Sequence, residues 1–186
     1  MKKIQKHTIV IMGIVLNVIG AYIAMTFKIP FYMDSIGTIF VAGILGFKYA
    51  IITGILGSLV SGMTFDIYSL YYAPVQIFTG FFAGILYDTK WLNGKRMVLG
   101  NLLVAIPTSL ASAIITAVLF NGITSSGSTF LVIILNKLKF NLVTSILLVQ
   151  IFTDYIDKLL AVVISKIFIQ RLHFKIDVRG KNGTIQ

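Results

Sequence analysis

Long apolar segments alternate with short polar connections along this sequence, and the lengths of the apolar segments predict helices that cross a membrane. A spanning helix needs roughly 20 apolar residues, because the hydrocarbon core of a bilayer is about 30 Å thick. We therefore predict an all-α integral membrane protein, a compact bundle of six transmembrane helices that forms a single domain over residues 1–186. The expected spans lie at about residues 8–27, 36–46, 48–62, 71–87, 97–120 and 142–169.

Two apolar stretches depart from the simple pattern of one helix per segment. Residues 36–62 are too many for one span, and Gly46-Phe47-Lys48 interrupts them, so we expect two short helices there. The stretch Thr129–Asn141 is apolar but contains Asn136, Lys137 and Lys139, which predicts an interfacial or re-entrant helix.

The composition supports this class and excludes several others. Of the 186 residues, 57% are hydrophobic and 12% are charged, and the mean hydropathy is +0.93, a balance that a soluble domain of this length does not show. The absence of cysteine excludes disulfides, thiolate metal sites and cysteine nucleophiles. The two histidines, His7 and His173, lie at opposite ends of the chain, so we expect no metal site and no cofactor.

The net charge of +10 indicates membrane topology. The basic residues lie between the hydrophobic segments and form no stripe with interleaved aromatic residues, so we expect no nucleic-acid partner. Cytoplasmic connections of membrane proteins carry an excess of Lys and Arg, and in the six-span arrangement only Lys28, Lys137 and Lys139 fall opposite the termini, with Lys158 inside a span. We therefore expect both termini to be cytoplasmic. Twelve basic residues fall on their side: Lys2, Lys3, Lys6, Lys48, Lys90, Lys95, Arg96, Lys166, Arg171, Lys175, Arg179 and Lys181.

The last apolar segment contains three charged residues, Asp154, Asp157 and Lys158, in a chain with six acidic residues and no glutamate. An ionised side chain at membrane depth costs several kcal/mol, so it is kept there mainly when it faces a polar cavity or a partner. With Gln150, the two aspartates follow the spacing i, i+4, i+7, which places all three on one face of a helix.

Other polar and aromatic residues are expected at the same depth, in the outer half of the bundle. Together with Asp154, Asp157 and Gln150 they predict a pocket open to the outside, in which aromatic rings stack on a ligand and carboxylate, amide and hydroxyl groups hold its polar edge. These residues are Tyr32 and Asp34 in the first connection, Tyr72 and Gln76 at the start of the fourth segment, and Ser109, Ser112 and Thr116 in the fifth.

Each part of this pocket has a structural alternative. Asp154 and Lys158, at i and i+4, can neutralise one another as a pair. Serines and threonines can serve close helix packing, and Tyr71 and Tyr72 can mark the membrane boundary. Asp34-Ser35 can be the N-cap of the helix that follows.

A stripe of small or hydrogen-bonding residues follows the first segment. Gly13, Asn17, Gly20 and Ala24 are spaced by four, three and four residues, which places them on one helix face. Small residues let another helix approach closely. The stripe predicts either packing within this chain or docking on a separate membrane protein.

Several short motifs occur in a fixed order along the chain. They are Leu16–Ala24, Ile29-Pro30, Asp34-Ser35-Ile36-Gly37-Thr38-Ile39, the Gly46-Phe47-Lys48 break and Tyr155-Ile156-Asp157-Lys158. With its size and segment lengths, the chain resembles the substrate-binding S components of energy-coupling factor vitamin transporters, which are six-span proteins of prokaryotic cell membranes. The Asp-Ser-Ile-Gly-Thr motif looks most like members assigned to pyridoxine or to the hydroxymethyl pyrimidine precursor of thiamine.

The resemblance implies a function and a set of partners. The chain would bind a vitamin or precursor from the outside, with the connection Lys28–Ser35 as a lid, and it would not itself be an enzyme. Two cytoplasmic ATPase subunits would supply energy through a transmembrane coupling subunit, against which the stripe of Gly13, Asn17, Gly20 and Ala24 would pack. The sequence agrees in having no Gly-x-x-x-x-Gly-Lys-Ser/Thr phosphate loop.

Two other classes of function stay open from the residues alone. One is a proton-coupled small-molecule carrier or a membrane sensor that acts without partners. The other is an intramembrane enzyme that uses Asp154 and Asp157 as a paired acid and base or as metal ligands, although no glutamate or histidine lies at that depth to complete a ligand set.

Overall fold

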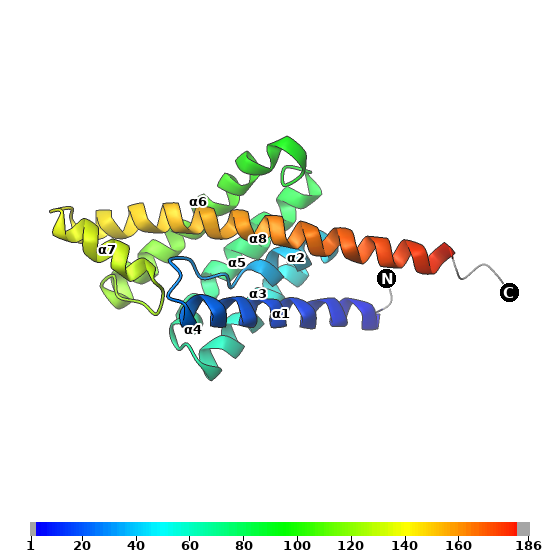
Figure 1. Ribbon diagram of the computed structural model, residues 1–186, viewed down its shortest axis with the longest axis horizontal. Helices are drawn as coiled ribbons and strands as arrows, with labels where there is room; N and C mark the ends of the chain where they lie inside the picture. Colours follow the sequence, from blue (N-terminus) through cyan, green and yellow to red (C-terminus); the bar gives the residue numbers. More distant parts are fainter. Residues whose placement is uncertain (1–2, 182–186) are drawn as a thin grey trace.

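A computed structural model of the chain describes residues 3–181, with side chains described through Arg171. The described residues are helical with short connections and contain no strand, so the all-α prediction is confirmed. Figure 1 shows the helices as a bundle from which α8 extends at one end. The elements are α1 (Lys3–Thr26), α2 (Ile36–Leu45), α3 (Phe47–Thr64), α4 (Tyr68–Tyr71), α5 (Ala73–Asp88), the 3₁₀ turn η1 (Gly94–Arg96), α6 (Met97–Phe120), α7 (Ser128–Lys137) and α8 (Leu142–Lys181).

The helix boundaries follow the apolar pattern closely. The predicted break at Gly46 is confirmed: this residue has φ +80°, a backbone conformation that glycine adopts without strain, and it separates α2 from α3. The segment expected at about 71–87 begins instead at Ala73, because Pro74 favours the first turn of a helix, and residues 68–71 form the separate turn α4. The last segment continues beyond the expected residue 169, to Lys181.

Three helical segments of the described residues are long and apolar enough to cross a membrane: Lys3–Thr26, Phe47–Thr64 and Gly94–Phe120. This fits a membrane protein. The other apolar helices differ for physical reasons. α5 has 16 residues, or about 24 Å at 1.5 Å per residue, and α8 carries Asp154, Asp157 and Lys158 near its middle.

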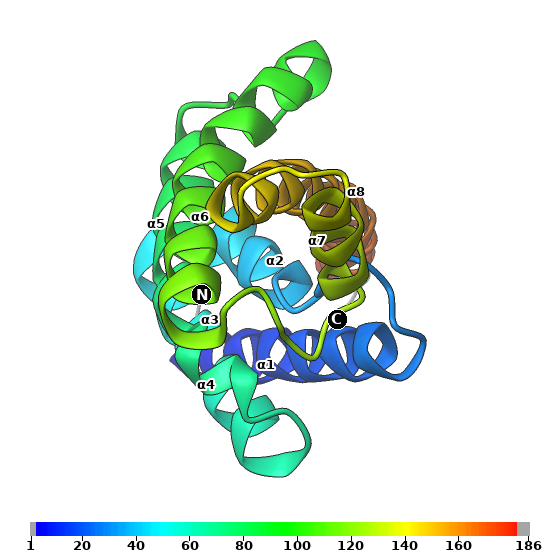
Figure 2. The same ribbon diagram turned by 90° about the vertical axis from the view of Figure 1, so that its left-hand side faces the viewer.

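α2 lies at the centre of the bundle, with α1, α3, α5 and α8 packed around it (Figure 2). All residues from Ile36 to Ala42 are buried. Its ten residues span about 15 Å, half the thickness of a bilayer core. Such a short helix is tolerated at membrane depth because other helices, and not lipid, surround its polar ends.

The N-terminus of α2 is capped by a side chain from α1. The first amides of a helix have no partner within it, and here the Asn17 Oδ1 atom accepts hydrogen bonds from Gly37 N at 2.7 Å and Thr38 N at 3.2 Å. Ser35 does occupy the N-cap position, but its side chain makes no capping bond. The predicted N-cap position at Ser35 is therefore correct, but the capping side chain is not that of Asp34 or Ser35. Asn17 supplies the acceptor, and the Ser35 hydroxyl has other partners.

The small-residue stripe of α1 is used inside the bundle. Gly13, Asn17, Gly20 and Ala24 are all buried. Gly13 contacts the backbone of Gly37, and Gly20 contacts the carbonyl of Met33, so closely that a Cβ atom at Gly20 would collide. Packing within the chain is thus the alternative that the structure confirms. The chain itself covers Gly13, Asn17, Gly20 and Ala24, and their docking on a separate membrane protein stays a prediction.

The connections between helices gather at two ends of the bundle. At one end, Lys6 near the start of α1 stacks on Tyr49 of α3, Gly84 of α5 contacts Phe47, and Ile169 of α8 approaches Gly43. At the other end, the connection of residues 27–35 meets the loop of residues 121–127 through Gly127 N and Ile29 O at 3.2 Å. Figure 1 shows α1 beginning and α8 ending at the same end.

We predict that Asn17→Ala lowers the free energy of unfolding by about 2–4 kcal/mol, because it leaves two buried amides of α2 without their acceptor and removes the hydrogen bond that Asn17 donates to the Thr38 hydroxyl. Thermal unfolding in detergent, followed by circular dichroism, measures this. Thr8→Ala is the matched control on α1, since it removes an exposed hydroxyl that bonds only its own helix, and it should cost less than about 0.5 kcal/mol. Equal stability of the two variants would show that Asn17 is no cap.

Candidate functional site

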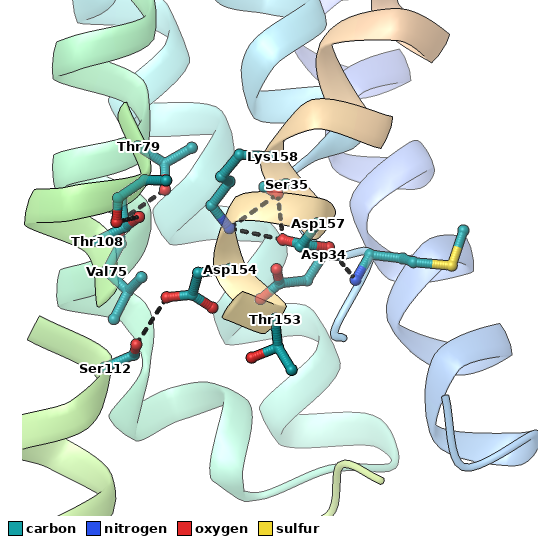
Figure 3. A network of polar contacts seen from close by, with 12 residues as sticks. Asp34, Ser35, Val75, Thr79, Thr108, Ser112, Thr153, Asp154, Asp157 and Lys158 are labelled. Atoms are coloured by element: carbon teal, nitrogen blue, oxygen red, sulfur yellow. Dashed lines mark hydrogen bonds and ion pairs between the residues drawn. The ribbon is translucent and has the colours of Figure 1, made fainter. Parts of the chain in front are cut away.

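Three charged residues near the middle of α8 are buried in the bundle and do not face lipid: Asp154 is 5% exposed, Asp157 2% and Lys158 2%. Lys158 Nζ lies 2.7 Å from Asp157 Oδ2, and this is the one ion pair within the described residues. Lys158 thus pairs with its chain neighbour Asp157, and the alternative i, i+4 ion pair of Asp154 and Lys158 does not form. Asp154 and Asp157 point to different partners, as Figure 3 shows.

Asp157 fastens the 27–35 connection to α8. Its Oδ1 atom accepts a hydrogen bond from Met33 N at 2.8 Å, and its Oδ2 atom accepts one from the Ser35 hydroxyl at 3.1 Å. Lys158 also donates to the Ser35 hydroxyl, at 3.1 Å. Both carboxylate oxygens of Asp157 therefore have partners in this chain and hold the connection against α8 (Figure 3), while its contact with a ligand stays a prediction.

Asp34 brings a third carboxyl group to this region from the connection itself. Burial raises the pKa of Asp34 to about 6, although the nearby Lys158 ammonium opposes that rise. Asp34, Asp154 and Asp157 all lie close enough to interact electrostatically with the single ammonium of Lys158. Three carboxyl groups thus surround one ammonium group, so this region favours a ligand that donates hydrogen bonds or carries positive charge.

A second set of polar contacts surrounds Asp154 and links α5, α6 and α8. The Ser112 hydroxyl donates to Asp154 Oδ2 at 2.8 Å. One turn along both helices, Gln150 Nε2 donates to the Thr116 hydroxyl at 2.9 Å, and that hydroxyl lies 2.6 Å from the Tyr72 hydroxyl. Ser112, Thr116, Gln150, Asp154 and Tyr72 are all buried.

This second set retains unused hydrogen-bonding capacity. Gln150 Oε1 is buried and makes no hydrogen bond with the described residues. The Tyr32 hydroxyl is buried without a well-formed hydrogen bond, although the hydroxyls of Thr124 and Tyr72 lie near it. The ring of Tyr32 lies 5.4 Å from that of Tyr72, at an angle of 41°, and burial raises the pKa of Tyr32, so its hydroxyl stays protonated. Buried polar groups without partners are costly, which marks this position as a candidate for binding. We call Tyr32, Tyr72, Ser112, Thr116, Gln150 and Asp154 the polar cluster.

Two predicted site residues have structural roles, and their contact with a ligand stays a prediction. Gln76 accepts a hydrogen bond from the Thr38 hydroxyl at 2.9 Å and donates to Asp34 O at 3.2 Å, so it positions the connection over α2. The Ser109 hydroxyl donates to Ala105 O at 2.7 Å within its own helix and approaches Gln150 O. For Ser109, close helix packing is the alternative that fits.

The polar cluster is closed from the end of the bundle by two layers of chain. The 27–35 connection lies over it, and the 121–127 loop in turn covers the connection, with Ser126 donating to Ile29 O. A small cavity of about 10 Å³ lies between them, lined by Tyr32, Asp66 and Ser125 among others. It has room for about one water molecule, so this cavity does not hold a vitamin-sized ligand in this conformation.

Asp66 is a structural residue that sequence reasoning did not single out. Its Oδ2 atom accepts hydrogen bonds from the Ser125 hydroxyl at 2.8 Å and the Ser69 hydroxyl at 3.2 Å. It therefore anchors the 121–127 loop to α4. Asp66 follows the end of α3 and is far in sequence from the 121–127 loop, so the sequence gave no signal of this contact.

The two late aspartates have different hydrogen-bond partners. Asp154 bonds Ser112, whereas Asp157 bonds Met33, Ser35 and Lys158. Among residues 3–171, no group of three or more His, Cys, Asp or Glu side chains lies close enough together to hold a metal ion.

Comparison of this chain with protein-family models, with curated proteins and with solved structures found no match.

Proposed function

We propose that this chain is the substrate-binding subunit of an ATP-driven energy-coupling factor importer, and that it captures a small vitamin or vitamin precursor from the outside of a prokaryotic cell membrane. The observation that carries the proposal is the polar cluster. Its unused acceptors and donors lie inside an apolar bundle, under a connection that a buried ion pair holds in place. Polar groups at membrane depth mark substrate sites by default.

The chemistry of the cluster suits a small heterocycle with hydrogen-bond donors. Asp154 and Gln150 Oε1 offer acceptors, and the Tyr32 hydroxyl can donate. The rings of Tyr32 and Tyr72 offer a surface for stacking. Pyridoxine and hydroxymethyl pyrimidine both present an aromatic ring with hydroxyl or amino groups, so they are the first ligands to test.

The proposed cycle begins with release of the connection. When Met33 and Ser35 leave Asp157, Tyr32 moves away from Tyr72 and opens a path to the cluster. The ligand then replaces the contact between the two rings, and the connection closes again on Asp157. Lys158 keeps the Asp157 carboxylate neutralised in both states, which limits the cost of opening.

We further propose that α1, α2, α3, α5, α6 and α8 are the six spans and that both termini are cytoplasmic. The gathering of the connections at two ends supports this. Eight of the twelve basic residues counted on the terminal side are described: Lys3, Lys6, Lys48, Lys90, Lys95, Arg96, Lys166 and Arg171. Lys2 and the side chains of Lys175, Arg179 and Lys181 lie outside the described residues, as does that of His173. The 27–35 connection and the polar cluster would then face outward.

Energy would come from a transmembrane coupling subunit and two cytoplasmic ATPases. Since the small-residue stripe of α1 is covered, the surface available to a membrane partner includes the exposed apolar face of the same helix, with Ile11, Val15 and Ile19. Lipid covers this face in the absence of a partner.

Ligand binding provides the first test of the proposal. Isothermal titration of the purified chain with pyridoxine and with hydroxymethyl pyrimidine should give saturable binding of one molecule, and Asp154→Asn should weaken it by about 1–3 kcal/mol through loss of a charged acceptor. Asp88→Asn, which removes an exposed aspartate on α5, is the control and should bind like wild type. No binding of these or other B vitamins by wild type would refute the proposed function.

Transport provides the second test and separates the importer from a carrier that acts alone. Liposomes that contain only this chain should not accumulate labelled ligand under a pH gradient, because energy is expected from ATPase partners. Empty liposomes give the background rate. Accumulation that follows the pH gradient in the absence of ATP would favour the stand-alone proton-coupled carrier.

A further inference from the structure

A second cavity, of about 370 Å³, lies at the end of the bundle opposite the 27–35 connection. Its half-buried walls come from α2, α5 and α8 through Gly43, Tyr87, Lys166 and Ile169. Its exposed rim includes Asp88, Asn93, Gly94 and Gln170. The volume lies within the range of small-ligand sites, and the polar cluster contributes no residue to it.

Two donors of this cavity lack a good acceptor. The Tyr87 hydroxyl is buried and makes no hydrogen bond with the described residues. The Lys166 ammonium lies 3.1 Å from the sulfur of Met97, which is a weak acceptor, and it takes no part in the ion pairing of residues 3–171. The Lys166 side chain is only half-buried, so its ammonium can exchange water for a ligand oxygen, and an oxyanion suits both this ammonium and the Tyr87 hydroxyl.

The surroundings of the cavity are positively charged. Lys95 and Arg96 follow the rim residue Gly94 in the turn η1, and Lys90 lies earlier in the same connection. Arg171 follows Gln170 on α8. Asp88 is the acidic residue of the rim, and its side chain is exposed, so water screens it. Trp91, 38% exposed in the same connection, is typical of the interface between a membrane and water.

We propose that this cavity binds a phosphate group, with the Lys166 ammonium and the Tyr87 hydroxyl as donors. At a membrane interface rich in Lys and Arg, the phosphate can belong to the head group of an anionic lipid or to a soluble phosphate compound. Both sources present the same oxygen atoms to the two donors. The site is separate from the proposed vitamin site and does not depend on it.

Thermal unfolding in nanodiscs tests the proposal and distinguishes the two sources. In one arm, wild type is compared in phosphatidylcholine alone and in phosphatidylcholine with phosphatidylglycerol. In the other, inorganic phosphate is titrated onto protein in phosphatidylcholine alone. Stabilisation by phosphatidylglycerol only identifies a lipid head group, and stabilisation by inorganic phosphate in the neutral bilayer identifies a soluble source.

Two variants show whether the cavity is responsible. Lys166→Gln and Tyr87→Phe should each weaken the apparent affinity for the stabilising phosphate about tenfold, as expected for loss of a hydrogen bond to a charged group. Tyr87→Phe leaves the net charge unchanged, so general electrostatic attraction cannot explain its effect. Lys90→Gln changes the charge at the same end without lining the cavity and should have the smaller effect.

Three results would overturn the proposal. The first is no stabilisation of wild type by either phosphate source. The second is a wild-type response in Tyr87→Phe. The third is a loss in Lys90→Gln as large as that in Lys166→Gln.

Discussion

A buried ion pair, between Asp157 and Lys158, organises the end of the bundle that holds the candidate site. Two charges in an apolar interior are costly to desolvate, and removing one partner of such a pair typically costs about 3–5 kcal/mol. Here the pair is kept because Asp157 also accepts hydrogen bonds from the 27–35 connection, while Lys158 donates to Ser35. The same two residues therefore join α8 to the start of α2 and keep Tyr32 against Tyr72. In the proposed cycle, opening of the polar cluster requires that these contacts break.

Much of the architecture could be predicted from hydrophobic pattern alone. The helical class, the break at Gly46 and the bounds of α6 depend on local composition and on glycine geometry, and the sequence displays both. The burial of Gln150, Asp154 and Asp157 also follows from their spacing and from the cost of charge in lipid. These are the features for which one segment of sequence holds the whole physical cause.

The partners of the polar residues could not be predicted, because they depend on distant segments. Asn17 looked like part of a docking stripe but caps α2, twenty residues later. Lys158 was expected beside Asp154 on the helix face, yet it turns to Asp157 because Ser35 lies there to accept a hydrogen bond as well. The Gly13 and Gly20 contacts likewise show close approach of segments within the chain, whereas the sequence indicated only that some close approach occurs.

Hydrogen–deuterium exchange of residues 28–38 tests most directly whether the Asp157–Lys158 pair closes the site. In wild type, the Met33 amide should exchange slowly, because it donates to Asp157, and Asp157→Asn should speed its exchange by about tenfold or more. The amides of Gly37 and Thr38, which Asn17 holds, should keep their wild-type rates and so show that the bundle stays folded. Equal exchange of Met33 in the two proteins would contradict the account.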